Sequence, residues 1–276
     1  MITIKLNFYK LSTSENTTVI ISDYVPERLY SKITDKVMAS TYLQAEQVGF
    51  LLPPEHKISA LKLRMSGGEF CGNGLLALSA LTDYLGIVDN SNFLVEISGV
   101  NLPLTAEVID KNYEKINYVI KADMPFSHSR KIYKCNFSDK INGEIIFLSG
   151  ISHFIIKGKK YFKKNILKDI MNEISRDISG KAVGIIPYYI KEGNYQIKPY
   201  IHVKENNSFV FERGCGSGTL ALGLYLAEEN NENIKISVHQ PGGIIEVGIK
   251  LNDKNKVNGA YLKSEVSLNC QGEVII

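Results

Sequence analysis

The sequence predicts an α+β protein built from two similar domains, and three observations support this class. The pattern C-G-[NS]-G-x-L-A-L occurs twice, and each copy opens an apolar stretch without proline that suits a helix. Short runs of β-branched and aromatic residues fill much of the remaining chain. Two copies are too few for a solenoid, which needs three or more stacked units. We therefore expect two related domains within the 276 residues.

The repeated segments are Glu69–Leu78 and Arg213–Leu222. Each places its cysteine just ahead of an apolar, amphipathic segment, Leu75–Leu85 in the first copy and Leu220–Leu226 in the second. Both segments predict helices, with the cysteine at the N-terminal end. The polar stretch Glu228–Asn233 predicts a surface loop after the second helix.

Strands are predicted where β-branched and aromatic residues cluster. The segment Met1–Phe8 alternates as a half-buried strand does, and it lacks the unbroken apolar core of a signal peptide. The other predicted strands are Thr17–Ser22, Leu94–Ile97, Ile145–Leu148, His153–Ile156, Ile197–Val203 and Ile244–Ile249. The expected class is thus α+β and rich in strands.

Composition and charge exclude several functional classes. Hydrophobic residues make up 44% of the chain and charged residues 22%, which indicates a folded core and excludes disorder. The 32 basic and 29 acidic residues leave a net charge of +3 without a long basic run, so nucleic acid is not an expected partner. No stretch approaches the roughly 18 apolar residues of a membrane helix, so we expect no membrane partner and a cytoplasmic location.

The four cysteines are Cys71, Cys135, Cys215 and Cys270. They form no C-x-x-C pair and have no histidine at zinc-ligand spacing, so no metal site is predicted, and in the cytoplasm they stay reduced. Cys135 and Cys270 have no surrounding pattern and are interpreted as inert thiols. The shared glycine-flanked context sets Cys71 and Cys215 apart.

A cysteine at a helix N-terminus lies beside unpaired N–H groups and the positive end of the helix dipole, which lower its pKa. Glycines after the cysteine let the backbone approach a ligand, so the exposed amides form a carboxylate site. These amides belong to Gly72, Asn73 and Gly74 in the first copy and to Gly216, Ser217 and Gly218 in the second. A phosphate is the alternative anion, but neither G-x-G-x-x-G nor a lysine-bearing P-loop is present in these segments.

If the two motifs face each other, they hold an amino-acid carboxylate with one sulfur on each side of its α-carbon. One thiolate then removes the α-proton while the opposite thiol delivers a proton, and the centre inverts without a cofactor. The backbone donors stabilise the developing enediolate charge. The pattern therefore predicts a cofactor-independent amino-acid racemase with a two-base mechanism. A catalytically silent amino-acid-binding protein is the alternative, although a pure binder has no need of two thiols.

The segments Phe70–Gly74 and Glu212–Thr219 resemble the two signature segments of the diaminopimelate epimerase family, the cofactor-independent two-thiol epimerases. The resemblance extends over nearly the whole chain. It implies two pseudo-symmetric domains, each a barrel-like, mostly antiparallel sheet around a central helix. The implied domains are residues 1–121 together with a returning C-terminal strand, 265–276, and residues 122–264. The family often dimerises, so the resemblance also implies a homodimer.

Within the family, three segments look closest to the branch that racemises histidine for staphylopine biosynthesis. They are Ala45–Phe50, Met65–Asn73 and Val238–Gly243. Asparagines that serve the distal end of diaminopimelate are missing from the segments Arg64–Gly68, Gly150–His153 and Gly184–Pro187. Histidine is therefore the expected substrate. The pair Glu212–Arg213 is kept as in the epimerases, so diaminopimelate stays open as the alternative.

The resemblance implies further substrate-binding residues, namely Asn16, Glu46, His153, Glu212 and Arg213. Asn16 matches an asparagine that faces the substrate. Glu46 is expected to accept a hydrogen bond from an imidazole N–H, or else to be a solvent-facing loop residue. His153 is expected to line the pocket, or else to be a satisfied histidine at a strand end. His239 is interpreted as structural, beside the turn at Pro241 and Gly242.

Overall fold

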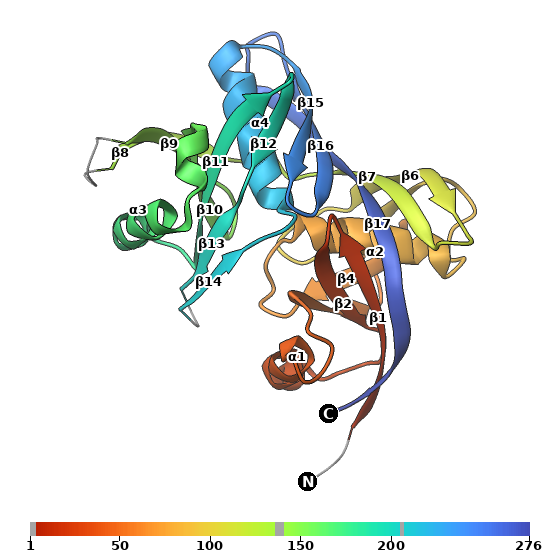
Figure 1. Cartoon of the computed structure of the whole chain (residues 1–276). Coiled ribbons are helices and arrows are strands. Elements are labelled where there is room, and N and C mark those ends of the chain that lie inside the picture. Colours follow the sequence, from red (N-terminus) through yellow and green to blue (C-terminus); the bar gives the residue numbers. More distant parts are fainter. Residues whose placement is uncertain (1–3, 136–140, 205–206) are drawn as a thin grey trace. The chain divides into compact units, whose positions relative to one another are not determined.

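The chain forms two compact units in a computed structural model that describes residues 4–135, 141–204 and 207–276. Unit 1 is Met1–Asp123 with Lys263–Ile276, and unit 2 is Met124–Leu262 (Figure 1). These limits differ by two residues from those that the resemblance implies. Strands predominate over helices in both units, as expected for an α+β chain.

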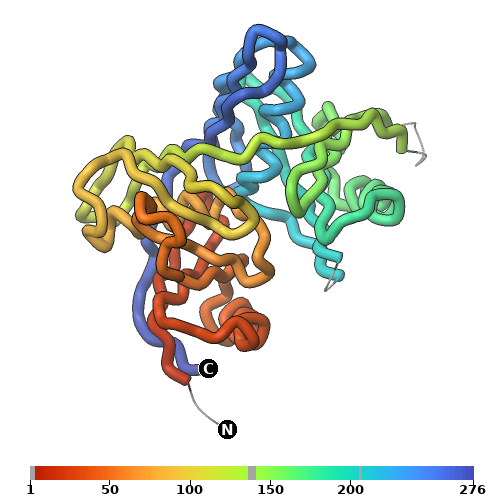
Figure 2. The backbone as a smooth tube through the Cα atoms, turned by 180° about the vertical axis from the view of Figure 1, so that it is seen from behind, coloured from red at the N-terminus to blue at the C-terminus, as the bar shows by residue number. Residues whose placement is uncertain are grey.

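Unit 1 consists of paired strands from both ends of the chain. Its strands are β1 (Lys5–Thr13), β2 (Asn16–Ile21), β3 (Gln47–Leu52), β4 (Ser59–Met65), β5 (Asn92–Ile97), β6 (Leu104–Asn112), β7 (Asn117–Asp123) and most of β17 (Val257–Ile275). The pairs β2–β3 and β4–β5 are parallel, whereas β1–β2, β3–β4, β5–β6 and β6–β7 are antiparallel. β17 pairs with β7 and runs antiparallel to β1, so the first and last strands lie side by side (Figure 2).

The central element of unit 1 is α2 (Gly72–Tyr84), which contacts β1, β2 and β4 to β7. Every residue from Gly72 to Thr82 is buried, because this apolar helix has strands on all sides. A second helix, α1 (Tyr30–Met38), follows the 3-10 turn Glu27–Leu29 and buries one apolar face against β3. Tyr30 of that face stacks on Phe50 with ring centroids 3.7 Å apart.

Unit 2 repeats the arrangement of strands around a buried helix. Its strands are β8 (Ser129–Lys134), β9 (Asn142–Phe147), β10 (Ile151–Lys157), β11 (Ala182–Lys191), β12 (Asn194–Ile197), β13 (Tyr200–Val203), β14 (Ser208–Phe211), β15 (Ile234–Gln240) and β16 (Gly243–Leu251). The pairs β10–β11 and β12–β15 are parallel, and the other pairings between these strands are antiparallel. The helix α4 (Gly216–Asn230) contacts β9, β10, β11, β15 and β16.

The helix α3 (Lys164–Asp177) covers β11 and β13 of unit 2 and follows the 3-10 turn Lys159–Phe162. It is amphipathic, unlike α4, and it buries Leu167, Ile170, Met171 and Ile174. No helix among the described residues combines the length and the apolarity needed to cross a membrane.

The two predicted helices are confirmed, and each begins directly after its cysteine. The loop predicted at Glu228–Asn233 is wrong in its first half, because α4 continues to Asn230. Glutamate is a good helix former, and the Glu228 carboxylate is held by His128 at 3.0 Å and by Arg130 at 3.3 Å. The helix ends where Asn231 takes a left-handed conformation with φ of 53°.

The strand predicted at Ile197–Val203 is two strands, β12 and β13. Lys198 and Pro199 separate them, because proline fixes its φ and has no N–H to donate to a ladder. The other predicted strands are present with small changes at their ends. Of Met1–Phe8, residues 1–3 lie outside the described residues, and β1 begins at Lys5.

Candidate active site

Both motif cysteines are N-cap residues of the buried helices. Cys71 (φ −135°) caps α2 and Cys215 (φ −123°) caps α4, each in an extended conformation. The sulfur of Cys71 accepts a hydrogen bond from the Gly74 N–H at 3.2 Å, and that of Cys215 accepts one from the Gly218 N–H at 3.2 Å. The repeated sequence therefore gives the same local geometry twice, with a backbone donor aimed at the sulfur.

The glycine three residues after each cysteine lies in close packing. A Cβ atom on Gly218 would lie 2.5 Å from Ile186 Cδ1 and 3.0 Å from Cys215 Sγ. At Gly74 it would lie 2.9 Å from Met65 Sδ. The absence of a side chain thus lets the first helical turn approach both its own sulfur and the neighbouring strand.

In unit 1, the Cys71 thiol has a neutral acceptor. Cys71 is partly exposed, and its S–H donates to Gln47 Oε1 at 2.9 Å. The same oxygen accepts a hydrogen bond from Thr18 Oγ1 at 3.3 Å, because Thr18 lies opposite Gln47 in the parallel β2–β3 pair. We call Cys71, Gln47 and Thr18, with Asn16 of the same strand face, the Cys71 cluster.

Asn16 is 1% exposed, and within the described residues neither its amide oxygen nor its amide nitrogen has a hydrogen-bond partner. It opens β2 two residues before Thr18, so the two side chains share one face of the sheet. Its register partner Thr13 likewise has a buried hydroxyl without a partner in that set. A buried amide left unpaired costs free energy, so Asn16 is a candidate to bind a polar ligand group.

Glu46 precedes β3 and is partly buried. Its Oε2 accepts a hydrogen bond from the Thr17 N–H at 3.1 Å, and its own N–H donates to the Thr17 carbonyl at 3.1 Å. Glu46 therefore ties the start of β3 to β2, which a purely solvent-facing residue does not do. Its role toward an imidazole stays a prediction.

In unit 2, Cys215 is 2% exposed, and its thiol has a charged neighbour, Glu212. Burial raises the pKa of Cys215 well above its usual range, and the charge of Glu212 and a hydrogen bond to Glu212 raise it further. The Ser217 hydroxyl and the Gly218 N–H lower this pKa by a smaller amount. The lowered pKa expected from the helix terminus is thus wrong for Cys215, because desolvation outweighs the helix dipole.

His153 and Ser217 extend the group around Cys215. The Nε2 atom of His153 lies 2.9 Å from Ser217 Oγ, which lies 3.6 Å from Cys215 Sγ. His153 is fully buried, and burial lowers its pKa to about 3, so its imidazole is neutral at physiological pH. Its ring packs on Gly184 of β11, where a Cβ would lie 2.3 Å from Nδ1. We call Cys215, Glu212, Ser217 and His153 the Cys215 cluster.

The sequence analysis missed Gln240, which holds the loop before α4. Its Oε1 accepts the Cys215 N–H at 2.8 Å, and its Nε2 donates to Thr219 Oγ1 at 2.8 Å. Ser98 has the corresponding place in the first copy, where its hydroxyl donates to the Glu69 carbonyl at 2.7 Å. In each copy, a polar residue lies at the end of the strand after the helix and is followed by a turn with glycine. This shared pattern could have identified Ser98 and Gln240 in the sequence.

Arg213, two residues before Cys215, contacts the turn that follows β15. It is exposed, and its guanidinium donates to the Pro241 carbonyl at 3.3 Å. The Arg213 carbonyl accepts the Gly242 N–H at 2.8 Å, which joins the motif to the turn between β15 and β16. His239 lies on β15 just before that turn.

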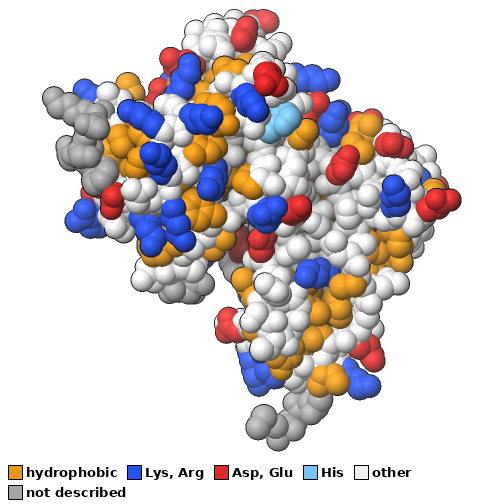
Figure 3. All heavy atoms as spheres, viewed as in Figure 1, with side chains coloured by type: hydrophobic (Ala, Val, Ile, Leu, Met, Phe, Trp, Pro, Cys, Tyr) orange, Lys and Arg blue, Asp and Glu red, His pale blue; other side chains and the backbone are white. Residues whose placement is uncertain are grey.

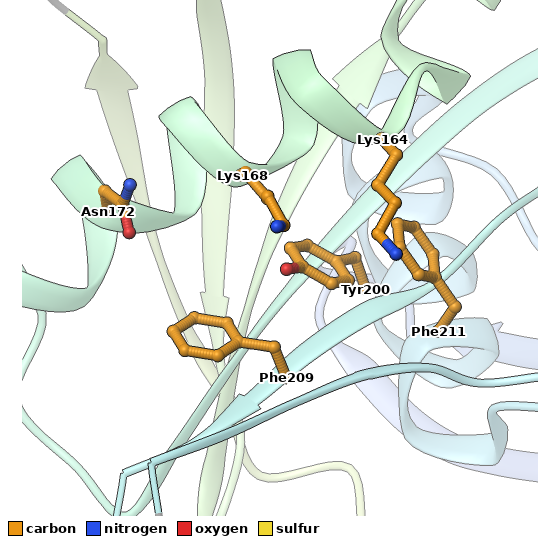
Figure 4. Close-up of a pocket in the computed structure, with 6 residues that line it drawn as sticks. All are labelled: Lys164, Lys168, Asn172, Tyr200, Phe209 and Phe211. Carbon is orange, nitrogen blue, oxygen red and sulfur yellow. The ribbon is translucent and has the colours of Figure 1, made fainter.

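A separate hollow of about 390 Å³ lies in unit 2 between α3 and the strands β13 and β14. Lys164, Lys168 and Asn172 of α3 face the rings of Tyr200, Phe209 and Phe211 (Figure 4). Basic and apolar side chains adjoin each other over this part of unit 2 (Figure 3). Among the described residues that line it there is no thiol or carboxylate, so it lacks the pair of sulfurs that the repeated motif supplies.

Within residues 4–135, 141–204 and 207–276, no three His, Cys, Asp or Glu side chains gather in a way that suits a metal ion. The groups that the two clusters offer are two thiols, two amides, two hydroxyls, one imidazole and one carboxylate.

Comparison with known sequences connects the whole chain to one family. The model of a family described as "Histidine racemase CntK N-terminal domain" matches residues 5–275. A protein named histidine racemase from Fusobacterium nucleatum subsp. nucleatum is 31% identical over an alignment of 277 positions, which covers 98% of this chain and 97% of the relative. A histidine racemase from Staphylococcus aureus is 28% identical and covers 89% of each chain.

Solved structures share the fold at low sequence identity. A hydroxyproline epimerase from Agrobacterium vitis, with bound trans-4-hydroxy-L-proline, has a TM-score of 0.73 at 8% identity and covers 99% of this chain and 93% of its own. A phenazine biosynthesis protein of the PhzF family from Bacillus anthracis has a TM-score of 0.68 at 14% identity, with full coverage of both chains. At these identities the likeness concerns the fold alone.

Proposed function

Since this chain belongs to the histidine racemase family and is therefore an isomerase, we propose that it interconverts L-histidine and D-histidine without pyridoxal phosphate. The family match over residues 5–275 supports histidine as the substrate. The missing asparagines in the segments that serve the distal end of diaminopimelate support it as well.

The proposed mechanism uses Cys71 and Cys215 as an acid–base pair on opposite faces of the α-carbon. The thiolate of one cysteine takes the α-proton, the C–H electron pair passes into an enediolate, and the thiol of the other delivers a proton. The second sulfur is then the thiolate, so the enzyme is ready for the reverse direction. The N–H groups at the start of α2 and α4 stabilise the substrate carboxylate and the enediolate.

The observation that carries this proposal is the duplicated N-cap geometry. Both sulfurs accept a backbone N–H at 3.2 Å, and each has a side-chain acceptor for its proton, Gln47 or Glu212. An inert structural cysteine needs neither partner. We also propose that each unit is the barrel-like half of an epimerase fold, which the strand pairings around α2 and α4 support.

The remaining site residues are proposed as binding groups. The amide of Asn16, which has no hydrogen-bond partner among the described residues, supplies a donor and an acceptor to the substrate. Glu46 supplies a carboxylate for the imidazole N–H. Glu212 and Arg213, which the epimerases share, are accounted for by contacts to Cys215 and to the turn at Pro241. Their presence therefore does not require a second zwitterion on the substrate.

The test is deuterium incorporation from D2O at the α-carbon across a panel of L-amino acids, followed by mass spectrometry and chiral chromatography. We expect exchange into histidine with the appearance of D-histidine. Exchange into diaminopimelate alone would replace histidine as the substrate. No exchange into any amino acid, with histidine binding retained, would make the chain a silent binder and refute the proposal.

A further inference from the structure

His153 has a hydrogen-bonding arrangement that a role as proton acceptor does not explain. Its Nε2 has a partner, Ser217 Oγ at 2.9 Å, whereas its Nδ1 is buried and has no partner among the described residues. A neutral imidazole carries one N–H and one bare nitrogen. Buried N–H groups without a partner are rarer than unpaired acceptors, so the hydrogen belongs on Nε2 and the bare nitrogen is Nδ1.

This tautomer fixes the direction of the Ser217 hydroxyl. The Nε2–H donates to Ser217 Oγ, so the hydroxyl hydrogen has to point elsewhere. The neighbouring acceptor is Cys215 Sγ, 3.6 Å away, which is within reach of a hydrogen bond to sulfur. The ring is fully buried and packs closely on Gly184, where a Cβ would lie 2.3 Å from Nδ1, so only a glycine leaves space for it.

We propose that His153 is a positioning residue, whose Nε2–H holds the Ser217 hydroxyl as a hydrogen-bond donor to the sulfur of Cys215. The hydroxyl then stabilises the Cys215 thiolate against the two groups that oppose it, the apolar surroundings and the Glu212 carboxylate. Because His153 stays neutral from mildly acidic to alkaline pH, this support does not change over the working range. The effect of this arrangement on racemisation rests on the proposed function, whereas the hydrogen-bond arrangement itself does not.

The experiment measures alkylation of each cysteine in the full-length protein by iodoacetamide, resolved by peptide mass spectrometry at pH 8. It requires no turnover, so it remains informative if the racemase proposal fails. Cys71 serves as the internal reference. The variants are Ser217→Ala, His153→Phe and the double variant. In each of the three, we expect the pKa of Cys215 to rise by about one pH unit.

A higher thiol pKa also makes the remaining thiolate more nucleophilic, so the alkylation rate of Cys215 should fall about threefold relative to Cys71. The double variant should be no slower than either single variant, because the two side chains act in series. An unchanged rate in His153→Phe, or a further fall in the double variant, would overturn the proposal. So would an equal change at Cys71.

A second pair of variants guards against misfolding of His153→Phe. His153→Gln places an amide N–H where the Nε2–H of the imidazole lies, whereas the side chain introduced by His153→Asn is too short to reach Ser217. His153→Gln should therefore keep the alkylation rate of the parent, and His153→Asn should match Ser217→Ala. Equal rates in these two variants would refute the positioning role, because they would show that the donor at this place does not matter.

Discussion

The Cys71 and Cys215 clusters share one backbone geometry but differ in everything that surrounds the sulfur. Cys71 is partly exposed and donates to the neutral amide of Gln47. Cys215 is buried beside the Glu212 carboxylate, and its pKa is raised. The N–H donor at 3.2 Å is common to both. At Cys215, burial and the Glu212 carboxylate raise the pKa despite this donor.

In the two-base mechanism that we propose, this difference between the clusters has a use. A two-base racemase begins each turnover with one thiolate and one thiol, and the raised pKa of Cys215 favours the thiol there at neutral pH. The duplicated motif thus supplies the backbone donors, and the unlike partners distinguish the two sulfurs.

The largest effect is expected from removing either sulfur. Cys71→Ala and Cys215→Ala should each reduce D-histidine formation by about 10³-fold or more, because each proton transfer needs its own group. Chiral chromatography of timed reactions measures the loss. Cys270→Ala, at an exposed position outside both clusters, is the matched control and should keep full activity. A single alanine variant that retains most of the turnover would refute the symmetric role of the two clusters.

Acid should weaken unit 2 through His153. Burial lowers the pKa of His153 from 6.5 to about 3. Between these two pH values, His153 is therefore protonated in the unfolded chain and neutral in the folded chain. The contribution to stability is complete above pH 6.5 and declines as pH falls toward 3, at about 1.4 kcal/mol per pH unit. Urea unfolding at pH 7, 6, 5 and 4 measures this slope. The unfolding free energy of His153→Gln should fall less steeply with decreasing pH than that of the parent. If the two dependences on pH were parallel, burial would not lower the pKa of His153.

The two glycines offer a comparison of packing. Gly218→Ala brings a Cβ within 2.5 Å of Ile186 Cδ1 and 3.0 Å of Cys215 Sγ, and we expect it to cost about 2 kcal/mol of unfolding free energy. In Gly74→Ala the new Cβ meets the flexible Met65 side chain at 2.9 Å. The better helix propensity of alanine offsets about 1 kcal/mol of the resulting loss in unfolding free energy, so we expect a smaller loss than for Gly218→Ala. Urea unfolding ranks the two variants. A larger loss for Gly74→Ala would reverse the packing comparison.

The smallest effect is expected from changing the charge of the side chain that accepts the thiol proton, Glu212 for Cys215 or Gln47 for Cys71. Glu212→Gln should lower the pKa of Cys215 by about one pH unit, because the like charge next to the thiolate is gone. Gln47→Glu introduces such a charge beside Cys71 and should raise its pKa by a similar amount. The alkylation rate of each cysteine as a function of pH measures both. If neither variant changes its own cysteine selectively, the acceptors are not what distinguishes the clusters.

The parts of the fold that depend on local sequence could be predicted. The cysteine, the glycine three residues later and the apolar run together define a helix start, and α2 and α4 begin where this pattern places them. The end of α4 was misplaced because charged side chains suggested a loop. The ion pairs of Glu228 with residues about 100 positions earlier in the chain were not visible in the local pattern.

The partners of the sulfurs depend on contacts between distant parts of the chain. Gln47 reaches Cys71 because β3 pairs with β2 and β4, which both contact α2. Gln240 reaches Cys215 because β15 contacts α4. Neither residue belongs to the repeated motif. The pKa of Cys215 could not be predicted either, since the local pattern shows the helix terminus but not the degree of burial.

The long strand β17 affects the order in which the molecule is completed during synthesis. It begins in unit 2 and ends in unit 1, where it pairs with β1 over Lys5–Thr13. The ribosome therefore releases the whole of unit 2 before the strand that completes unit 1. Until then the N-terminal strand exposes an unpaired edge, which nascent-chain chaperones are suited to protect. The Cys71 cluster, although encoded first, belongs to the unit that is finished last.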